Sequence, residues 1–508
     1  MSNAIAIGNV DFGGSVFTLA LGLVLWFLYT AFYRLVLSPI AAVPGPKLAA
    51  LTTMYAAYYD VFYPAQYVFK VKELHKKYGN IIRIGPEEVH VNDVEFLDPI
   101  YNPPSRKRNK YMPNMQGLPL DRSVGSAEHW DVHRKRRDAL SPFFSHKKVL
   151  DTETLIQEKV QEFCHTIDEF VGSERVLNLS DLNFALALDI VRKYSFGQDQ
   201  DVLAHLDEAN RLRNNLGQLL RSTKFNLYFG WVLGVTKLLP KSMTDSLVPP
   251  GVSDLINFRK VIRHDLEEIF ADSENTLKGP VNSVFYGLKD NSDLPDDERT
   301  IDRLEEEGSL LIMAGTESTA KSMQIAHYHL LANPSIMSHL RDELSKAGNP
   351  TTLKALEQLP YLSAVIYEAN RLSFGLTFRN TRVAPEPEVL QYKQYALPPG
   401  TAVSMSTLCI HTNEDIFPDP WTFNPDRFLG REGLDRRKYM MSMGRGTHKC
   451  IGINLANAEM CMAIAAVARY EMELFETDED DVKFLHDYHV SHPRLGSKGV
   501  RAKVVSKV

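Results

Sequence analysis

The sequence predicts a mainly α-helical protein with a few short strands, preceded by one N-terminal membrane-spanning helix. Helical periodicity dominates residues 126–331, whereas short strand-like patterns occur in 82–91, 389–405 and 499–508. A composition of 44% hydrophobic and 24% charged residues allows a sizeable core. The formal net charge of −6 argues against a nucleic-acid-binding protein, because such proteins are usually basic.

The first predicted element is a stretch without charged residues, Phe12 to Tyr33. As a helix it would reach about 33 Å, enough to cross a hydrocarbon core of about 30 Å. A cleavable signal peptide is the alternative, but no basic residue precedes the stretch and no small-x-small site follows it. Asp11 lies before the span, and Arg34 and Lys47 lie after it, so the positive-inside rule places the rest of the chain in the cytosol. We therefore expect residues 1–37 to be a single-pass anchor in the lipid of the endoplasmic reticulum membrane.

Prolines follow the anchor and predict a stiff hinge. Ser38-Pro39 and Val43-Pro44-Gly45-Pro46 cannot continue a helix, because proline lacks the amide hydrogen and restricts the residue before it. We assign residues 38–47 to the hinge and 48–508 to one catalytic body, in which no obvious linker appears. A hairpin is expected near the start of the body, where apolar residues alternate on both sides of Gly85-Pro86.

Four cysteines are too few for a disulfide framework in a chain of 508 residues, so each thiol is judged separately. Gly444 and Gly446 precede Cys450 and Gly452 follows it, and glycines let the backbone turn tightly and approach a flat ligand. A helix is expected over 453–470, which would place the thiol at the positive end of a helix dipole and lower its pKa. A buried structural cysteine is the alternative, and we assign the other three cysteines to it.

The residues around Cys450 resemble the signature of the cytochrome P-450 family, Phe-x-x-Gly-x-Arg-x-Cys-x-Gly. Gly446, Cys450 and Gly452 are in register, while Met443 replaces the phenylalanine and His448 replaces the arginine. The resemblance implies the cytochrome P-450 fold, a large helical domain with small β-sheets. It also implies haem b (iron protoporphyrin IX) with the Cys450 thiolate as the axial ligand of the iron. Gly446 and Gly452 would then lie against the haem, and His448 would donate to one of its propionates.

A second feature of the family joins three charged residues. Glu368 and Arg371 are three residues apart, on one face of an expected helix, and Arg427 follows in Phe-Asn-Pro-Asp-Arg-Phe. An exposed pair of this kind would contribute little to stability. The resemblance implies instead that Glu368, Arg371 and Arg427 form a buried structural triad that holds the cysteine loop in register.

A long helix is expected from near Asp302 to Leu331, where an Asn-Pro pair stops it. Gly315 costs such a helix about 1 kcal/mol relative to alanine, and a flat ligand or dioxygen lying against that face would account for it. In the family this segment carries an acid-alcohol pair that delivers protons during dioxygen activation. Glu317 and Ser318 match that pair, and Thr319 could substitute for Ser318. The alternative is that the hydroxyls only bond to helix carbonyls.

Further donors for the haem propionates are expected outside the cysteine loop. Trp130 and Arg134 match the family's Trp-x-x-x-Arg, one helical turn apart, and both side chains are hydrogen-bond donors suited to a carboxylate. Arg382 falls where the family often places another propionate partner, and Arg379 is close enough to compete. The prolines that the family usually has after Glu-x-x-Arg are absent here.

Together these features predict a haem-dependent monooxygenase that inserts oxygen from O2 into a hydrophobic small molecule, as in fungal biosynthetic members of the family. A terpenoid or polyketide intermediate of secondary metabolite biosynthesis would fit. Electrons would come from NADPH through a reductase, which could dock on basic residues within 134–137, 436–438 and Lys449. A solvated helix surface is the alternative for those residues. The predicted substrate pocket is lined by Met115, Leu118, Val124, Leu311, Ala314 and Val490.

Two other classes of function stay open at this stage. A haem-thiolate isomerase or dehydratase rearranges peroxides without a reductase, but such enzymes tend to lose the acid-alcohol pair that Glu317 and Ser318 match. A non-catalytic membrane haem-binding protein would need neither a proton path nor a substrate loop.

Overall fold

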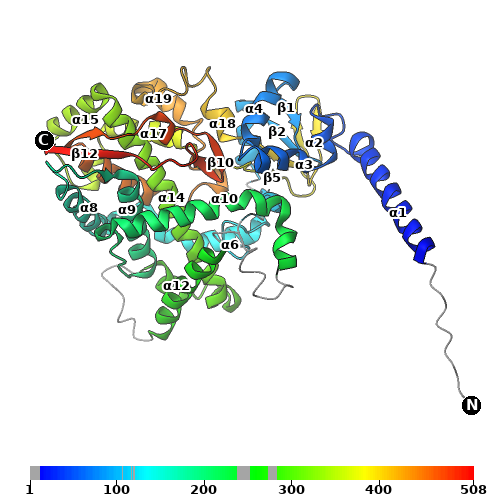
Figure 1. The fold of residues 1–508 in the computed structure, drawn as a ribbon, viewed down its shortest axis with the longest axis horizontal. Coiled ribbons are helices and arrows are strands. Elements are labelled where there is room, and N and C mark those ends of the chain that lie inside the picture. Colours follow the sequence, from blue (N-terminus) through cyan, green and yellow to red (C-terminus); the bar gives the residue numbers. More distant parts are fainter. Residues whose placement is uncertain (1–11, 106, 116, 118–119, 237–251, 273–282) are drawn as a thin grey trace, which may run out of the picture.

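The computed structural model describes residues 12–105, 107–115, 117, 120–236, 252–272 and 283–508. A single apolar helix, α1 (Phe12–Phe32), projects from a helical body and continues into a short π-helix, Tyr33–Leu37 (Figure 1). The segment Val16–Leu37, which covers most of α1 and the π-helix, has a mean hydropathy of 1.9 and is not buried against the body. The prediction of one N-terminal helix that is long and apolar enough to cross a membrane is therefore confirmed.

The predicted hinge, residues 38–47, packs against the body. Ile40 and Val43 are buried in the same apolar cluster as the first strands. The Arg83 amide donates to the Pro44 carbonyl at 2.7 Å, and the Arg83 guanidinium donates to the Arg34 carbonyl at 2.6 Å. Gly45 lies so close to this strand that a Cβ there would be 2.3 Å from the Arg83 carbonyl oxygen. Arg83 thus holds the hinge through its backbone and the end of the anchor through its side chain.

Most of the chain is helical, as predicted. The body contains α2 (Lys47–Leu51), α3 (Met54–Ala57), α4 (Tyr67–Tyr78), α5 (Leu97–Tyr101), α6 (Trp130–Leu140), α7 (His146–Asp151), α8 (Glu153–Asp168), α9 (Leu179–Phe196), α10 (Leu206–Thr236), α12 (Val252–Ala271), α13 (Val284–Lys289), α14 (Ile301–Ala332), α15 (Pro334–Lys346), α16 (Leu353–Leu356), α17 (Pro360–Ser373), α18 (Thr407–His411), α19 (Gly430–Arg437) and α20 (Ile453–Val467). Helix α20 ends earlier than expected, because the chain enters a strand at Tyr470.

The strands form small sheets at the edges of the helical body. They are β1 (Ile81–Arg83), β2 (Glu88–Val91), β3 (Asn109–Lys110), β4 (Leu177–Asn178), β5 (Arg382–Val383), β6 (Leu390–Tyr392), β7 (Tyr395–Leu397), β8 (Ala402–Ser404), β9 (Tyr470–Leu474), β10 (His486–Tyr488), β11 (Val490–His492) and β12 (Arg501–Lys507). The largest sheet has the order β1-β2-β8-β5-β3 and includes the predicted hairpin. It lies on the side of the body from which α1 projects (Figure 1).

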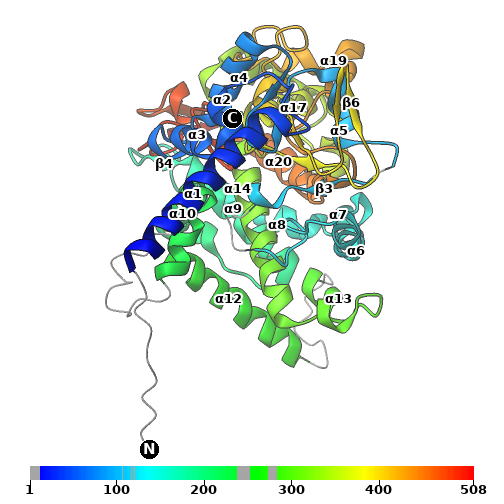
Figure 2. The ribbon, with the colours of Figure 1, turned by 90° about the vertical axis from the view of Figure 1, so that its right-hand side faces the viewer.

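Helix α14 runs through the middle of the body and packs against α9, α12, α17 and α20 (Figure 2). The Thr300 side chain caps its first turn by accepting from the Arg303 amide. The tight packing against α9 explains Gly315, since a Cβ there would be 2.7 Å from a methyl carbon of Val191. The expectation that Gly315 makes room for a flat ligand is therefore wrong: the glycine lets two helices approach each other closely.

Candidate functional site

The loop before Cys450 is held by backbone hydrogen bonds and by close approach to its neighbours. The Cys450 amide donates to the Met443 carbonyl at 2.7 Å. Gly446 has a left-handed φ of 63°, and a Cβ there would be 2.0 Å from the Tyr101 carbonyl oxygen, so only glycine fits. Glycine is therefore required at position 446 by the left-handed turn and by the close contact with Tyr101. Gly452 is different, because no atom lies within 4 Å of where its Cβ would be, which leaves the open side that a flat ligand requires.

The Cys450 thiol lies just before α20, as predicted, but its pKa is not lowered. Burial raises the pKa of the Cys450 thiol, and a hydrogen bond to the Gly452 backbone and the charges of Arg137 and Lys449 offset this only in part. The expectation of a lowered pKa is therefore wrong for the protein alone, because desolvation outweighs the helix end. A metal ion at the sulfur would reverse the balance, since coordination deprotonates a thiol.

An accessible patch interrupts the buried surface of α14. Ala314 and Ser318, four residues apart and so on one face, remain exposed, while Thr316 and Thr319 are buried. Cys450 is also exposed, although protein surrounds it closely enough to desolvate the thiol. Helix α14, which packs against α20, therefore has an accessible face in the middle of its length.

The hydroxyl groups of the predicted proton path differ in their surroundings. The Ser318 hydroxyl lies on the accessible face and donates to the Ala314 carbonyl at 2.7 Å, which is the helix back-bond considered as an alternative. Thr319 lies on a buried face, so the structure does not place it as a substitute for Ser318. Burial raises the pKa of Glu317, and the nearby charges of Lys321 and Arg213 offset this in part.

Two buried cations lie opposite each other at the edge of the largest sheet. In the antiparallel register of β3 and β5, Lys110 lies directly opposite Arg382. The Lys110 ammonium donates to the Val124 carbonyl at 3.0 Å, and the Arg382 guanidinium donates to its neighbouring Thr381 carbonyl at 3.0 Å. Burial lowers the pKa of Lys110 and lowers that of Arg382 to about 10. Within the described parts of the chain, neither side chain forms an ion pair with a carboxylate.

Two buried cations opposite each other are unfavourable unless an anion binds between them. Like charges opposite each other on two strands destabilise a sheet, and buried charges need a partner of opposite sign. The charge of Glu307 acts on Lys110 and raises its pKa, but Glu307 pairs with Arg303 at 2.5 Å. The pair of Lys110 and Arg382 is therefore suited to the carboxylates of a ligand.

Arg379 does not compete with Arg382 for this role. Its guanidinium donates to Glu88 at 2.9 Å and to Asn114 at 3.3 Å, and it lies over the ring of Tyr67. Arg379 thus has its own buried carboxylate, whereas Arg382 has none among the residues that the structure describes.

Helix α6 turns a different face toward Cys450 than the sequence suggested. Arg134 is exposed, lies over the Trp130 ring at 5.4 Å and pairs with Asp138 at 3.4 Å, so the structure does not bring Trp130 and Arg134 together with Cys450. Arg137 is the arginine of α6 whose charge acts on the Cys450 thiol. The haem role of Trp130 and Arg134 stays a prediction, and sequence reasoning missed Arg137.

His133, on the same face of α6 as Arg137, packs on His448. The two rings are 4.0 Å apart between centroids. Nε2 of His448 is 3.1 Å from the Arg108 carbonyl oxygen, and its buried Nδ1 has no partner among the described residues. Burial lowers the pKa of His448, so the ring is neutral, and with Nε2 donating to Arg108 its Nδ1 is an acceptor. While Nε2 keeps its bond to Arg108, donation from His448 Nδ1 to a propionate would therefore require a protonated ring.

The structure brings the three predicted triad residues together. The Arg371 guanidinium donates to both carboxylate oxygens of Glu368, at 2.7 and 2.8 Å, and Arg427 donates to one of them at 2.9 Å. All three side chains are buried. Behind α17, Gly375 approaches Ser442 so closely that a Cβ would be 2.1 Å from its carbonyl oxygen, which joins the triad helix to the cysteine loop without the usual prolines.

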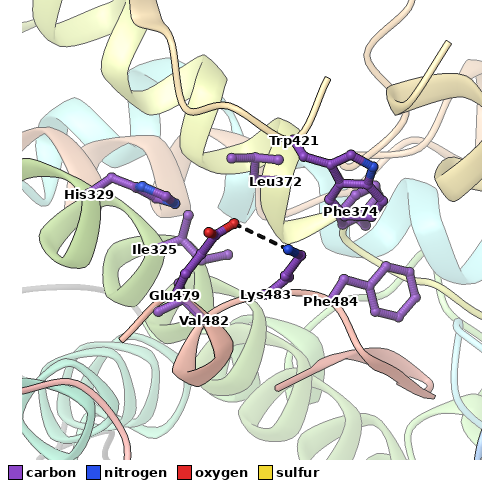
Figure 3. Close-up of a pocket in the computed structure, with 9 residues that line it drawn as sticks. All are labelled: Ile325, His329, Leu372, Phe374, Trp421, Glu479, Val482, Lys483 and Phe484. Carbon is purple, nitrogen blue, oxygen red and sulfur yellow. Dashed lines mark ion pairs between the residues drawn. The ribbon is translucent and has the colours of Figure 1, made fainter. Parts of the chain in front are cut away.

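The predicted pocket residues divide into three groups. Ala314 is accessible, Met115 is half-buried, and Val124, Leu311 and Val490 are buried. Leu118 lies outside the described residues. A small pocket near the C-terminal end of α14 contains none of the predicted residues. Figure 3 shows its lining: Ile325, His329, Leu372, Phe374, Trp421, Glu479, Val482, Lys483 and Phe484.

The predicted basic face for a reductase is partly neutralised within the chain. Arg136 pairs with Glu298 at 2.9 Å, Arg436 with Glu432 at 3.1 Å and Lys438 with Asp435 at 2.6 Å. Lys135 and Lys449 are exposed. The docking role of this surface stays a prediction.

The described residues fit haem. Cys450 is exposed, Ala314 and Ser318 on α14 are accessible, and the charges of Lys110 and Arg382, which have no carboxylate partner among the described residues, act on His448 in the cysteine loop. Haem has an iron that binds thiolate and two carboxylates that would neutralise cations. Arg137, Lys110 and Arg382 would hold the carboxylates, and Cys450 would hold the iron.

Comparisons with known proteins agree with this geometry. The Cytochrome P450 family model matches residues 49–495. Cytochrome P450 monooxygenase TRI4 of Trichoderma arundinaceum is 33% identical over 95% of each chain. Cytochrome P450 monooxygenase tpcC of Cochliobolus heterostrophus is 35% identical over 98% of this chain and 99% of its own, and astB of Talaromyces wortmannii is 34% identical over the same shares. The predicted family and fold are confirmed: the chain belongs to the cytochrome P450 family and is a cytochrome P450 monooxygenase.

Proposed function

We propose that this monooxygenase binds haem b through the Cys450 thiolate and oxidises a hydrophobic terpenoid or polyketide intermediate of secondary metabolite biosynthesis. The single observation that carries the haem assignment is the exposed Cys450 beside Arg137, together with Lys110 and Arg382, whose charges act on His448 of the same loop and which pair with no carboxylate among the described residues. The substrate class rests on the relatives, which are fungal cytochrome P450 monooxygenases.

The haem, when bound, supplies dioxygen activation and oxygen transfer. Binding, orientation and proton transfer are the roles of the chain's own residues. The Cys450 sulfur holds the iron, and Arg137, Lys110 and Arg382 fix the orientation of the ring by pairing with its carboxylates. The Ser318 hydroxyl passes a proton from the accessible face of α14. Glu317 replaces that proton, and its raised pKa means that it is protonated more often than an exposed glutamate.

We further propose that electrons come from NADPH through a membrane-bound reductase, and that the body faces the cytosol at the endoplasmic reticulum. Helix α1, which is long and apolar enough to cross a membrane, supports a membrane location, and the charge difference across it supports this orientation. Exposed Lys135 and Lys449 would contribute to a contact with an acidic reductase surface.

The function is tested by supplying the full chain in membranes with NADPH, a reductase and isotope-labelled dioxygen. A panel of terpenes and polyketides is offered as substrates. We expect NADPH consumption that depends on substrate, and one labelled oxygen atom per product. Peroxide rearrangement without NADPH and without label incorporation would instead support the isomerase or dehydratase.

The hydrogen bond of Ser318 back to Ala314 bears directly on the proposed proton path. A relay through Ser318 requires the hydroxyl to leave this bond. If the relay operates, Ser318→Ala lowers product formation by roughly 10²-fold or more and diverts electrons to hydrogen peroxide, because a positioned proton donor contributes on this scale. Thr319→Ala is the matched control and leaves the ratio of peroxide to product unchanged, because Thr319 is buried on another face. An unchanged ratio in Ser318→Ala would remove the relay.

A further inference from the structure

A buried histidine connects the triad to the cysteine loop. His411 is the last residue of α18, and its side chain is fully buried. It is joined to Arg371 twice: the Arg371 guanidinium donates to the His411 carbonyl at 3.0 Å, and His411 Nδ1 is 2.9 Å from the Arg371 carbonyl oxygen. Because Arg371 is itself fixed by Glu368, the position of His411 follows from the triad.

The second nitrogen of the same ring binds the cysteine loop. The Met441 amide donates to His411 Nε2 at 2.9 Å. A neutral imidazole has one N–H and one acceptor nitrogen, so Nε2 must accept and Nδ1 must donate to the Arg371 carbonyl. Burial lowers the pKa of His411 to about 3, which keeps the ring neutral at ordinary pH. Both ring nitrogens are thus used, in a single tautomer.

Met441 is the point at which the loop leaves the body. Its carbonyl accepts from the Gly444 amide at 2.9 Å, and the following residue, Ser442, lies against Gly375. The contact from His411 therefore fixes the first turn of the segment that ends at Cys450. Nothing else among the described residues binds the Met441 amide.

We propose that His411 is a positioning residue, which transmits the fixed position of the Glu368–Arg371–Arg427 triad to Met441 and so sets where the Cys450 sulfur stands. The inference rests on the proposed role of Cys450 as the haem ligand. A purely structural His411 is the competing explanation, since its ring packs near Phe374 and Phe417 at 5.8 and 6.2 Å between centroids. If His411 only packed in the core, its substitution would lower the stability of the fold but would not change the ligation of the iron.

Two substitutions separate the two hydrogen bonds. The amide oxygen of glutamine can take the place of Nε2, so His411→Gln keeps an acceptor for the Met441 amide. The amide nitrogen of asparagine can take the place of Nδ1, so His411→Asn keeps the donor to Arg371 but loses the contact with Met441. His327→Asn is the matched control, because His327 is equally buried in α14 and neither of its ring nitrogens has a partner among the described residues.

The full chain is measured in two ways. Hydrogen exchange at the Met441 amide is followed without haem, and the fraction of haem with thiolate ligation is read from the reduced carbon-monoxide spectrum. We expect His411→Asn to speed Met441 exchange by about 10-fold or more, since about 1.4 kcal/mol corresponds to tenfold and a buried unsatisfied donor costs on that scale. The same variant should lose most of the thiolate-type band, whereas His411→Gln and His327→Asn should retain it.

The proposal is overturned if His411→Asn matches His327→Asn in both measurements, or if His411→Gln is as damaging as His411→Asn. If His411→Asn does not accumulate as folded protein, the His411→Gln variant decides alone. The proposal is then overturned if His411→Gln shows fast exchange at the Met441 amide and has lost the thiolate-type band. A wild-type chain without a thiolate-type band contradicts the proposed role of Cys450. In that case the exchange measurement still reports whether His411 holds Met441.

Discussion

At the scale of single residues, the charged side chains around the site differ in whether they already have a partner. Arg379 and Arg382 are three residues apart and both are buried. Arg379 is paired with Glu88, whereas Arg382 lies opposite another cation, Lys110. Removing one member of a buried ion pair leaves an uncompensated charge, while removing one of two opposed cations relieves repulsion. The same substitution should therefore cost much more stability at Arg379 than at Arg382.

We predict that Arg379→Met lowers the free energy of unfolding of the haem-free chain by about 3 kcal/mol, because Glu88 loses its cation. Arg382→Met should lower it by less than about 1 kcal/mol, because a repulsion disappears with the side chain. The same Arg382→Met variant should release haem about 10-fold faster than the wild type. Denaturant unfolding and transfer of haem to an acceptor protein measure the two effects. Equal loss of stability in both variants, with unchanged haem release, would count against Arg382 as a carboxylate partner.

The same residues show what the sequence could and could not indicate. Cys450, the triad and Arg382 were predicted from short motifs that resemble those of the cytochrome P-450 family, and such motifs can be found in one sequence. Lys110 was not, because its significance depends on pairing with a strand far away in the chain. Arg137 was missed because a run of four consecutive basic residues, Arg134 to Arg137, does not reveal which of them faces the body, and the Trp-x-x-x-Arg spacing pointed to Arg134.

At the scale of elements, the packing of α14 against α9 explains a residue that was expected to serve a ligand. Gly315 lies against Val191, which is β-branched and has little freedom to rotate away. The boundaries of α14 were predicted within a residue or two, since periodicity and the stop signal are local. The reason for Gly315 was not predictable, because the neighbouring helix that it meets is a tertiary contact.

We predict that Gly315→Ala destabilises the chain by roughly 1–3 kcal/mol through overpacking against Val191. In a Val191→Ala background the same substitution should stabilise the chain by about 1 kcal/mol, because the clash is gone and alanine favours the helix. Thermal unfolding of the two single variants and the double variant gives the coupling. Stabilisation by Gly315→Ala in both backgrounds would show that the helices are not in close contact there.

At the scale of the whole molecule, the anchor and the body meet through a docked segment. Ile40 and Val43 are buried against the body, whereas α1 has no buried residue in its apolar window. The sequence predicted the anchor and the proline segment, because both are marked by composition. It did not predict that the proline segment packs against the first sheet, since the partners of Ile40 and Val43 are distant strands and loops.

We predict that deletion of residues 1–37 releases the body from membranes with its haem binding intact. Deletion of residues 1–47 should also remove the buried Ile40 and Val43, and each buried side chain of this kind contributes about 1.5–3 kcal/mol. The longer deletion should therefore lower the unfolding temperature and the yield of folded haem protein, as measured by fractionation and spectroscopy. Equal stability of the two deletions would show that the segment 38–47 does not belong to the folded body.

The central claim, that the Cys450 sulfur holds a haem iron, is tested most directly by the reduced carbon-monoxide spectrum of the full chain. Cys450→Ala should abolish the red-shifted band typical of thiolate ligation, whereas Cys409→Ala and Cys461→Ala, which change buried thiols away from the loop, should retain it. Persistence of the band in Cys450→Ala, together with its loss in Cys409→Ala or Cys461→Ala, would contradict the assignment.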